Sequence, residues 1–153
     1  MDFLIFGTGL IDSFGYLGVF LVSLIFSLGL TMPLPLSTVI IFAGAIMNPL
    51  IVALFAGVGS ALGESISFVL GASGNKILKK KIKFLPKIKR NLEKNKYLLP
   101  FFAMLPLPSM VLGLSAGVIK YNKYMFVISV LFGRIVKMLI YAFIGYFGRN
   151  LVF

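Results

Sequence analysis

The chain has 153 residues, of which 59% are hydrophobic, and its mean hydropathy is +1.05. A soluble domain has about 45–50% apolar residues, so this composition indicates an integral membrane protein. The absence of cysteine and histidine excludes thiol nucleophiles, disulfides, haem ligation and ordinary zinc sites, and we expect no metal and no cofactor.

The net charge of +11 is concentrated in one segment of the chain. Ten of the fifteen basic residues lie between Lys76 and Lys96. A basic loop between membrane spans is more often a positive-inside signal, lying against anionic headgroups, than a nucleic-acid site. We therefore expect residues 75–96 to lie at the cytoplasmic surface of a cell membrane, and we expect no nucleic-acid partner.

The first part of the chain predicts a surface helix and then a broken helical hairpin. Residues 1–12 are apolar but short, which favours an interfacial helix without a cleaved signal peptide. The uncharged run 14–31 is followed by Pro33 and Pro35, and the next run, 36–47, covers only ~18 Å of a ~30 Å bilayer core. Broken backbone is stable in lipid only where protein or a cavity covers it. The pattern predicts a re-entrant hairpin, although residues 14–31 alone are long enough to span.

Residues 50–72 form an apolar run long enough to cross the bilayer, with Glu64 near its middle. In the basic segment 75–96 the apolar residues recur every three or four positions, which is typical of amphipathic helices with lysines among the headgroups. We therefore expect this segment to bind the membrane surface.

The second part of the chain repeats the plan of the first. Apolar residues lead into Pro106-Leu107-Pro108, and residues 109–119 lead out again. Residues 125–147 then predict a second full span, which carries Arg134 and Lys137 at mid-depth.

The two proline motifs belong to an internal repeat. Pro33-Leu34-Pro35 and Ala43-Gly44 recur 73 residues later as Pro106-Leu107-Pro108 and Ala116-Gly117. We predict one all-α integral membrane domain over residues 1–153. Repeat one covers about 14–72 and repeat two about 97–149, each a re-entrant hairpin followed by a transmembrane helix, with interfacial amphipathic helices in addition. Because each hairpin enters and leaves on the side of the membrane opposite to the other, the repeats are inverted, which is the pattern of transporters with a midplane site.

The charges inside the predicted spans are the candidate binding site. A charge at mid-bilayer costs about 2.5–3.5 kcal/mol on insertion scales, so Glu64, Arg134 and Lys137 need a reason to be there. One reason is structural, since Glu64 paired with either cation holds two helices together. The other is functional, since one surplus cation attracts an anionic headgroup, and the helix starts at Ser37 and Ser109 add N–H donors.

These motifs resemble the DedA proteins, also called the SNARE-associated or VTT-domain family. The matching residues are the two Pro-x-Pro motifs with their Ala-Gly pairs, Gly59-x-x-x-Gly63-Glu64, and residues 126–134. The resemblance covers residues 14–149 and identifies a short, divergent member, because Thr31, Ser37, Ala103 and Ser109 stand where many members carry charges. It implies re-entrant hairpins in inverted repeat and the movement of lipids between leaflets, including recycling of polyprenyl-phosphate carriers.

Three functions remain open from the sequence. The first is a flippase or scramblase for an anionic lipid that binds Arg134, Lys137 and Glu64. The second is a small-solute or ion transporter that uses the same site, and the third is a non-catalytic membrane scaffold. An enzyme is the least expected, because one intramembrane carboxylate without histidine or cysteine is a poor basis for hydrolysis. Homo-oligomerisation is also left open.

Overall fold

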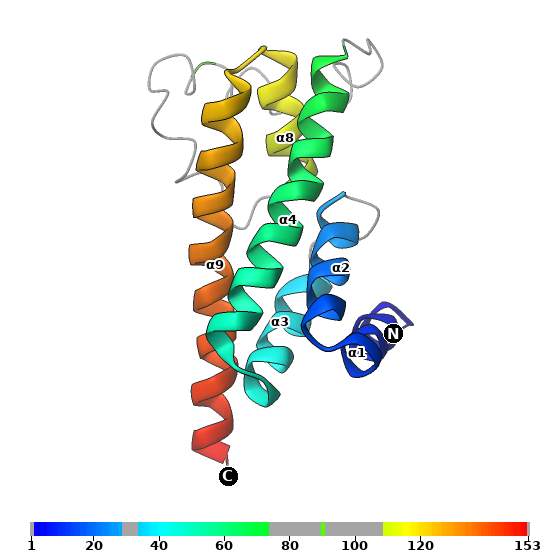
Figure 1. The fold of residues 1–153 in the computed structure, drawn as a ribbon, viewed down its shortest axis with the longest axis vertical. Helices are drawn as coiled ribbons and strands as arrows, with labels where there is room; N and C mark the ends of the chain where they lie inside the picture. Colours follow the sequence, from blue (N-terminus) through cyan, green and yellow to red (C-terminus); the bar gives the residue numbers. More distant parts are fainter. Residues whose placement is uncertain (1, 29–33, 74–89, 91–108, 153) are drawn as a thin grey trace.

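The computed structural model describes residues 2–28, 34–73, 90 and 109–152, and all secondary structure in these ranges is helical (Figure 1). The described helices are α1 (Asp2–Phe14), α2 (Tyr16–Ser27), α3 (Leu34–Ile46), α4 (Pro49–Ala72), α8 (Ser109–Val118) and α9 (Lys123–Val152). Pro33, Pro106, Pro108 and the basic segment, apart from Arg90, lie outside the described residues, so the predicted hairpin tips and surface helices there stay predictions.

Two helices form the long axis of the molecule. α4 has 24 residues and α9 has 30, which at 1.5 Å per residue gives lengths of ~36 and ~45 Å. Both are long and apolar enough to cross a membrane. They run in opposite directions and pack against each other (Figure 1). The two predicted spans are therefore present, although α9 extends beyond the predicted residues 125–147 at both ends.

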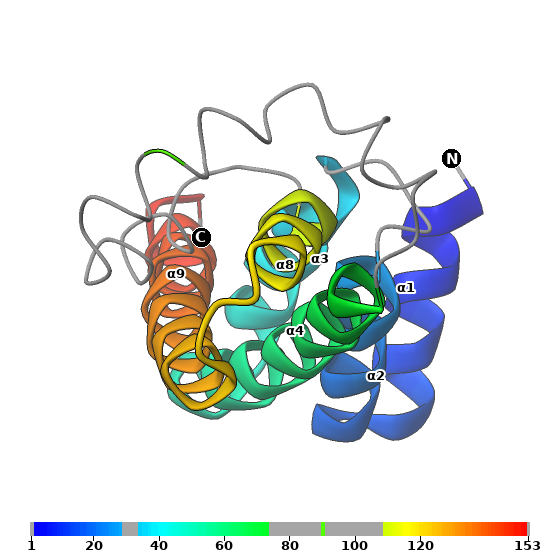
Figure 2. The same ribbon diagram turned by 90° about the horizontal axis from the view of Figure 1, so that it is seen from above.

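The four shorter helices are grouped around this pair. α1 and α2 meet at Gly15, whose φ of 57° needs a residue without a Cβ. α2 packs along α4, α3 along α9, and α8 along α4. In Figures 1 and 2, α3 and α8 lie at opposite ends of one side of the α4–α9 pair, and their first turns face each other. With 12 and 13 residues, α2 and α3 are each too short for a ~30 Å core.

The α3–α9 and α8–α4 contacts are built in the same way. Gly44 of α3 lies against Ala142, and Gly145 of α9 lies against Ile41. In the other half, Gly117 of α8 lies against Phe68, and Gly71 of α4 lies against Leu114. A Cβ on any of these four glycines would overlap partner backbone, so each glycine allows two helices to approach closely.

Corresponding residues of α3 and α8 in these contacts, such as Gly44 and Gly117, are 73 positions apart. Corresponding residues of α4 and α9, such as Gly71 and Gly145, are 74 positions apart. The N-caps agree with the larger offset. Asn48 accepts hydrogen bonds from the amides of Leu50 and Ile51, and Asn122 accepts them from Tyr124 and Met125. The additional residue lies in the turn after α8, where Lys120 has a φ of 53°. The 73-residue offset of the proline motifs aligns Glu64 with Lys137. The 74-residue offset of the helix contacts aligns Glu64 with Met138 instead.

Candidate functional site

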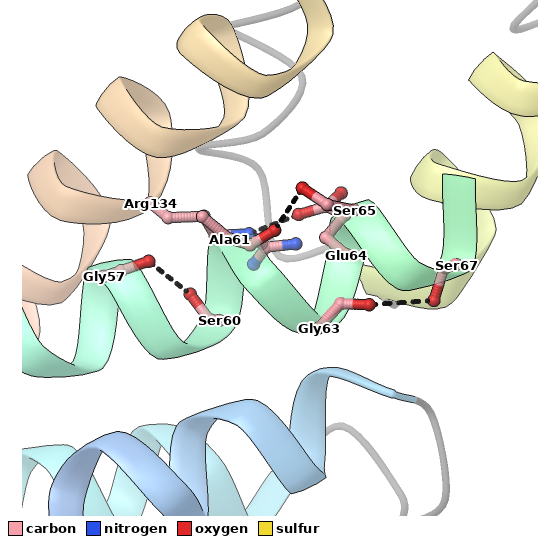
Figure 3. Close-up of polar contacts among 8 residues, drawn as sticks. All are labelled: Gly57, Ser60, Ala61, Gly63, Glu64, Ser65, Ser67 and Arg134. Atoms are coloured by element: carbon pink, nitrogen blue, oxygen red, sulfur yellow. Dashed lines mark hydrogen bonds and ion pairs between the residues drawn. The ribbon is translucent and has the colours of Figure 1, made fainter. Parts of the chain in front are cut away.

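The centre of the site is an ion pair between the two long helices. Arg134 Nε of α9 donates a hydrogen bond to Glu64 Oε2 of α4 over 2.7 Å (Figure 3). Glu64 is 0% and Arg134 2% exposed. The structure thus brings together two of the three predicted charged residues, and the pair joins α4 to α9 as the structural interpretation expected.

Helices from both ends of the molecule reach the level of this pair. At the end of α2, a Cβ on Gly63 would lie 2.9 Å from Ser27 Cβ. In the first half of α8, a Cβ on Gly113 would lie 2.6 Å from the Glu64 carbonyl oxygen. Glu64 is consequently enclosed by α2 on one side and α8 on another, with α9 supplying its charged partner.

The ion pair satisfies only part of its own hydrogen-bonding capacity. Glu64 Oε1 is buried and has no hydrogen-bond partner among the described residues. Among the described residues, Arg134 makes one hydrogen bond, which it donates through Nε. Its two terminal nitrogens donate none to these residues. A guanidinium has five donors arranged as a planar fork, so the terminal nitrogens retain the geometry that carboxylates and phosphates accept bidentately.

The serines near the pair do not complete it. The hydroxyls of Ser60, Ser65 and Ser67 donate to carbonyls one turn earlier in α4 (Figure 3). The buried hydroxyls of Ser23, Ser27 and Ser115 have no partner within the described ranges. Sequence reasoning missed these three residues, because a serine within an apolar run gives no signal of its burial.

Lys137 lies three residues after Arg134, about 4.5 Å further along the axis of α9 on a neighbouring part of its face. Its Nζ is 5.8 Å from the centre of the Tyr141 ring, a cation–π distance. Sequence reasoning also missed Tyr141, although the spacing of four residues to Lys137 is the signal that would have found it.

The remaining predicted site residues lie at helix starts. Ser37 is half-buried in the first turn of α3, and Ser109 begins α8. Ser37 takes no part in the Glu64–Arg134 hydrogen bond. Pro35 lies in the first turn of α3, where the missing amide proton of proline is tolerated. No group of three or more Asp, Glu, His or Cys that could hold a metal occurs in the part of the chain that is described.

Comparison with known proteins gives one match. The sequence pattern of the VTT domain matches residues 34–147, which include the Glu64–Arg134 pair and four of the six described helices in whole or in part. Searches of curated proteins and of solved structures found no match. The matched range covers most of the chain and contains the two helices that are long and apolar enough to cross a membrane. This protein therefore belongs to the VTT-domain (DedA, SNARE-associated) family of membrane proteins.

Proposed function

We propose that the protein moves an anionic lipid between the leaflets of a cell membrane, with the headgroup phosphate binding Arg134 near the midplane. The observation that carries this proposal is the incomplete ion pair. A buried guanidinium, bonded through Nε alone within the described residues, presents two terminal nitrogens in the fork that suits a phosphate.

The surroundings of the pair favour an anion as its ligand. Glu64 neutralises one charge, and Lys137 supplies a second cation one turn along α9. The first turns of α3 and α8 face each other from opposite ends of the molecule, so that the positive ends of both helix dipoles are directed toward the same middle region (Figure 1). Glu64 then competes with the headgroup for the same cations and so promotes its release.

The proposed architecture is a pair of inverted re-entrant hairpins. Support comes first from α2 and α3, which are too short to span, and from the end of α2, which lies beside Gly63 in the interior of α4. Further support comes from the matching glycine contacts of α3 with α9 and of α8 with α4. In this arrangement residues 75–96 face the cytoplasm and lie against anionic headgroups, and both termini face the other side. A cysteine placed at position 87 of this cysteine-free chain is then labelled only after the membrane is permeabilised, and labelling from outside intact cells contradicts this topology.

The test of the function is lipid transfer in proteoliposomes. Purified protein is reconstituted into phosphatidylcholine vesicles with a fluorescent phosphatidate, and dithionite reports the fraction of probe that reaches the outer leaflet. We expect the natural chain to transfer the probe, Arg134→Gln to lose transfer, and Arg149→Gln to keep it, since Arg149 is an exposed arginine at the end of the same helix.

A variant that does not fold would also fail to transfer lipid. The paired variant Glu64→Gln with Arg134→Gln is therefore measured as well, because two amides can replace the ion pair without leaving a buried charge. We expect this variant to be helical and monodisperse in detergent but inactive. Normal transfer by a folded Arg134 variant refutes the site. Absence of transfer by the natural chain refutes the function and favours a scaffold that only binds lipid.

A further inference from the structure

An apolar cluster fills the interface between α4 and α9 on one side of the ion pair. Its buried members come from α4, α8 and α9 and are Ala61, Phe68, Leu112, Ala116, Phe126 and Val130. Phe68 lies one turn after Glu64 in α4, and Val130 lies one turn before Arg134 in α9. The cluster therefore adjoins the ion pair on both helices. It extends from there toward the end of the molecule at which α4 ends and α9 begins (Figure 1).

The centre of this cluster is an aromatic stack that crosses the α4–α9 interface. The ring centroids of Phe68 and Phe126 are 4.6 Å apart, and the ring planes are inclined by 27°. Phe68 is 9% and Phe126 0% exposed. Two rings in contact leave no space between them for a hydrated phosphate, because close-packed interiors contain few voids larger than a water molecule. A headgroup cannot pass between α4 and α9 here while the rings are stacked.

The corresponding cluster in the other half of the molecule has no counterpart of this stack. With the offsets of 73 residues for α8 and 74 for the long helices, five members of the first cluster correspond to Val39, Ala43, Val52, Ala56 and Ala142. All five are buried in a second cluster, which lies on the other side of the ion pair along α4 and α9. In this second cluster Ala142 stands at the position of Phe68, and Val52 stands at that of Phe126. The aromatic stack is thus a feature of one side of the ion pair.

The packing of the helices indicates how the stack could separate. α2 and α8 pack along α4, whereas α3 packs along α9. A close contact between the two long helices lies at Gly57, whose Cβ would be 2.9 Å from Ile135 Cα. Along α4 this contact is followed by the ion pair at Glu64 and then by the stack at Phe68. Rotation of α9 with α3 about the Gly57 contact therefore displaces the stacked rings more than the ion pair, because displacement grows with distance from the pivot.

We propose that the Phe68–Phe126 stack is a gate that holds this end of the α4–α9 interface closed and separates when a headgroup passes to or from Arg134. This inference rests on the proposed function. A phosphate that binds Arg134 competes with Glu64 for the guanidinium and so weakens the ionic link between the two helices next to the stack. In the topology proposed above, the gate faces the cytoplasmic leaflet.

A crosslink across the interface tests whether the rings must separate. Phe68→Cys and Phe126→Cys are combined in this cysteine-free chain, and the thiols are bridged with dibromobimane, a short crosslinker whose fluorescence reports bridging. We expect the unbridged chain to transfer fluorescent phosphatidate at no less than half the natural rate. Bridging should lower the rate at least tenfold, whereas monobromobimane, which modifies each thiol without joining them, should lower it less than threefold.

A second pair of stacked phenylalanines provides the matched control. Phe143 and Phe147 stack at a centroid distance of 5.9 Å and an angle of 26°, but both belong to α9. A bridge between Phe143→Cys and Phe147→Cys joins one helix to itself and leaves α4 free to move relative to α9. We therefore expect this bridge to change the rate of transfer less than twofold.

Leucine substitutions test the gate without a crosslinker. Phe68→Leu and Phe126→Leu each remove the stack but keep an apolar side chain of moderate size in the cluster. We expect each to raise the rate of transfer at least twofold, because the closed interface loses the contact that holds it, and we expect Phe143→Leu to leave the rate unchanged. Circular dichroism and monodispersity in detergent establish that the variants are folded. A purely structural role of the rings predicts the opposite change, a lower rate in proportion to the loss of folded protein.

The outcomes distinguish the gate from the function on which it rests. If the natural chain transfers phosphatidate and Arg134→Gln does not, but the bridged Phe68→Cys/Phe126→Cys chain transfers at its unbridged rate, the gate is refuted and the binding site stands. Natural or lower rates in both folded leucine variants refute the stack as the contact that holds this end closed. If the natural chain transfers no lipid, the proposed function itself is refuted.

Discussion

The Glu64–Arg134 pair permits a quantitative prediction by a double-mutant cycle. Both side chains are almost completely buried, and their hydrogen bond is 2.7 Å long. Removing one partner of a buried pair leaves an uncompensated charge and costs about 3–5 kcal/mol. We therefore expect Arg134→Gln and Glu64→Gln each to lower the free energy of unfolding by about that amount.

The doubly substituted chain is expected to lose less than the sum of the two single losses. Two amides at these positions can hydrogen-bond and leave no buried charge, so the coupling free energy should be about 2–3 kcal/mol. Circular dichroism of refolded protein, titrated with sodium dodecyl sulfate in mixed micelles, measures all four chains of the cycle. Arg149→Gln, at an exposed position of α9, should change stability by no more than about 0.5 kcal/mol. Additive losses from the two single substitutions would show that the residues do not stabilise one another, and the reasoning would be wrong.

Two further predictions concern packing and capping. Gly117→Ala should destabilise the protein by about 1–3 kcal/mol, because the new Cβ would overlap the Phe68 carbonyl. Gly148→Ala is the control and should be neutral or stabilising, because no heavy atom lies within 4 Å of its Cβ. Equal effects of the two substitutions in thermal unfolding would contradict the close contact of α8 with α4. Asn48→Ala and Asn122→Ala should each cost about 1 kcal/mol, because each removes a side-chain oxygen that accepts from two backbone amides, and Asn48→Asp and Asn122→Asp should recover most of the loss in the same unfolding measurement.

Much of the helical layout could be predicted because proline, asparagine and hydrophobic run length act locally. Asn48-Pro49 predicts the start of α4, where the asparagine caps and the proline occupies the first position. The run 109–119 predicts α8 within one residue. The break between the predicted helix over residues 1–12 and the run 14–31 is present, but it lies at Gly15, because a glycine in an apolar run does not reveal its positive φ in advance. α9 is longer than the predicted span 125–147, because the helix continues past the apolar run at both ends, from Lys123 to Val152.

The charged site could be predicted only in part, because the sequence does not give the contacts between α4 and α9. Burial cost identified Glu64, Arg134 and Lys137 as a group, because few charged residues are retained inside membrane spans without a partner. One extra residue near Lys120 changes the offset between corresponding residues from 73 in α3 and α8 to 74 in α4 and α9. Neither offset tells which cation Glu64 meets, because the hydrogen bond joins it to Arg134, 70 residues later. In the internal repeat, Met138 of the second half therefore corresponds to Glu64 of the first, and Lys137 corresponds to Gly63. Symmetry within the repeat therefore does not identify the partner of the carboxylate, and the hydrogen bond from Arg134 to Glu64 comes from the packing of α4 against α9.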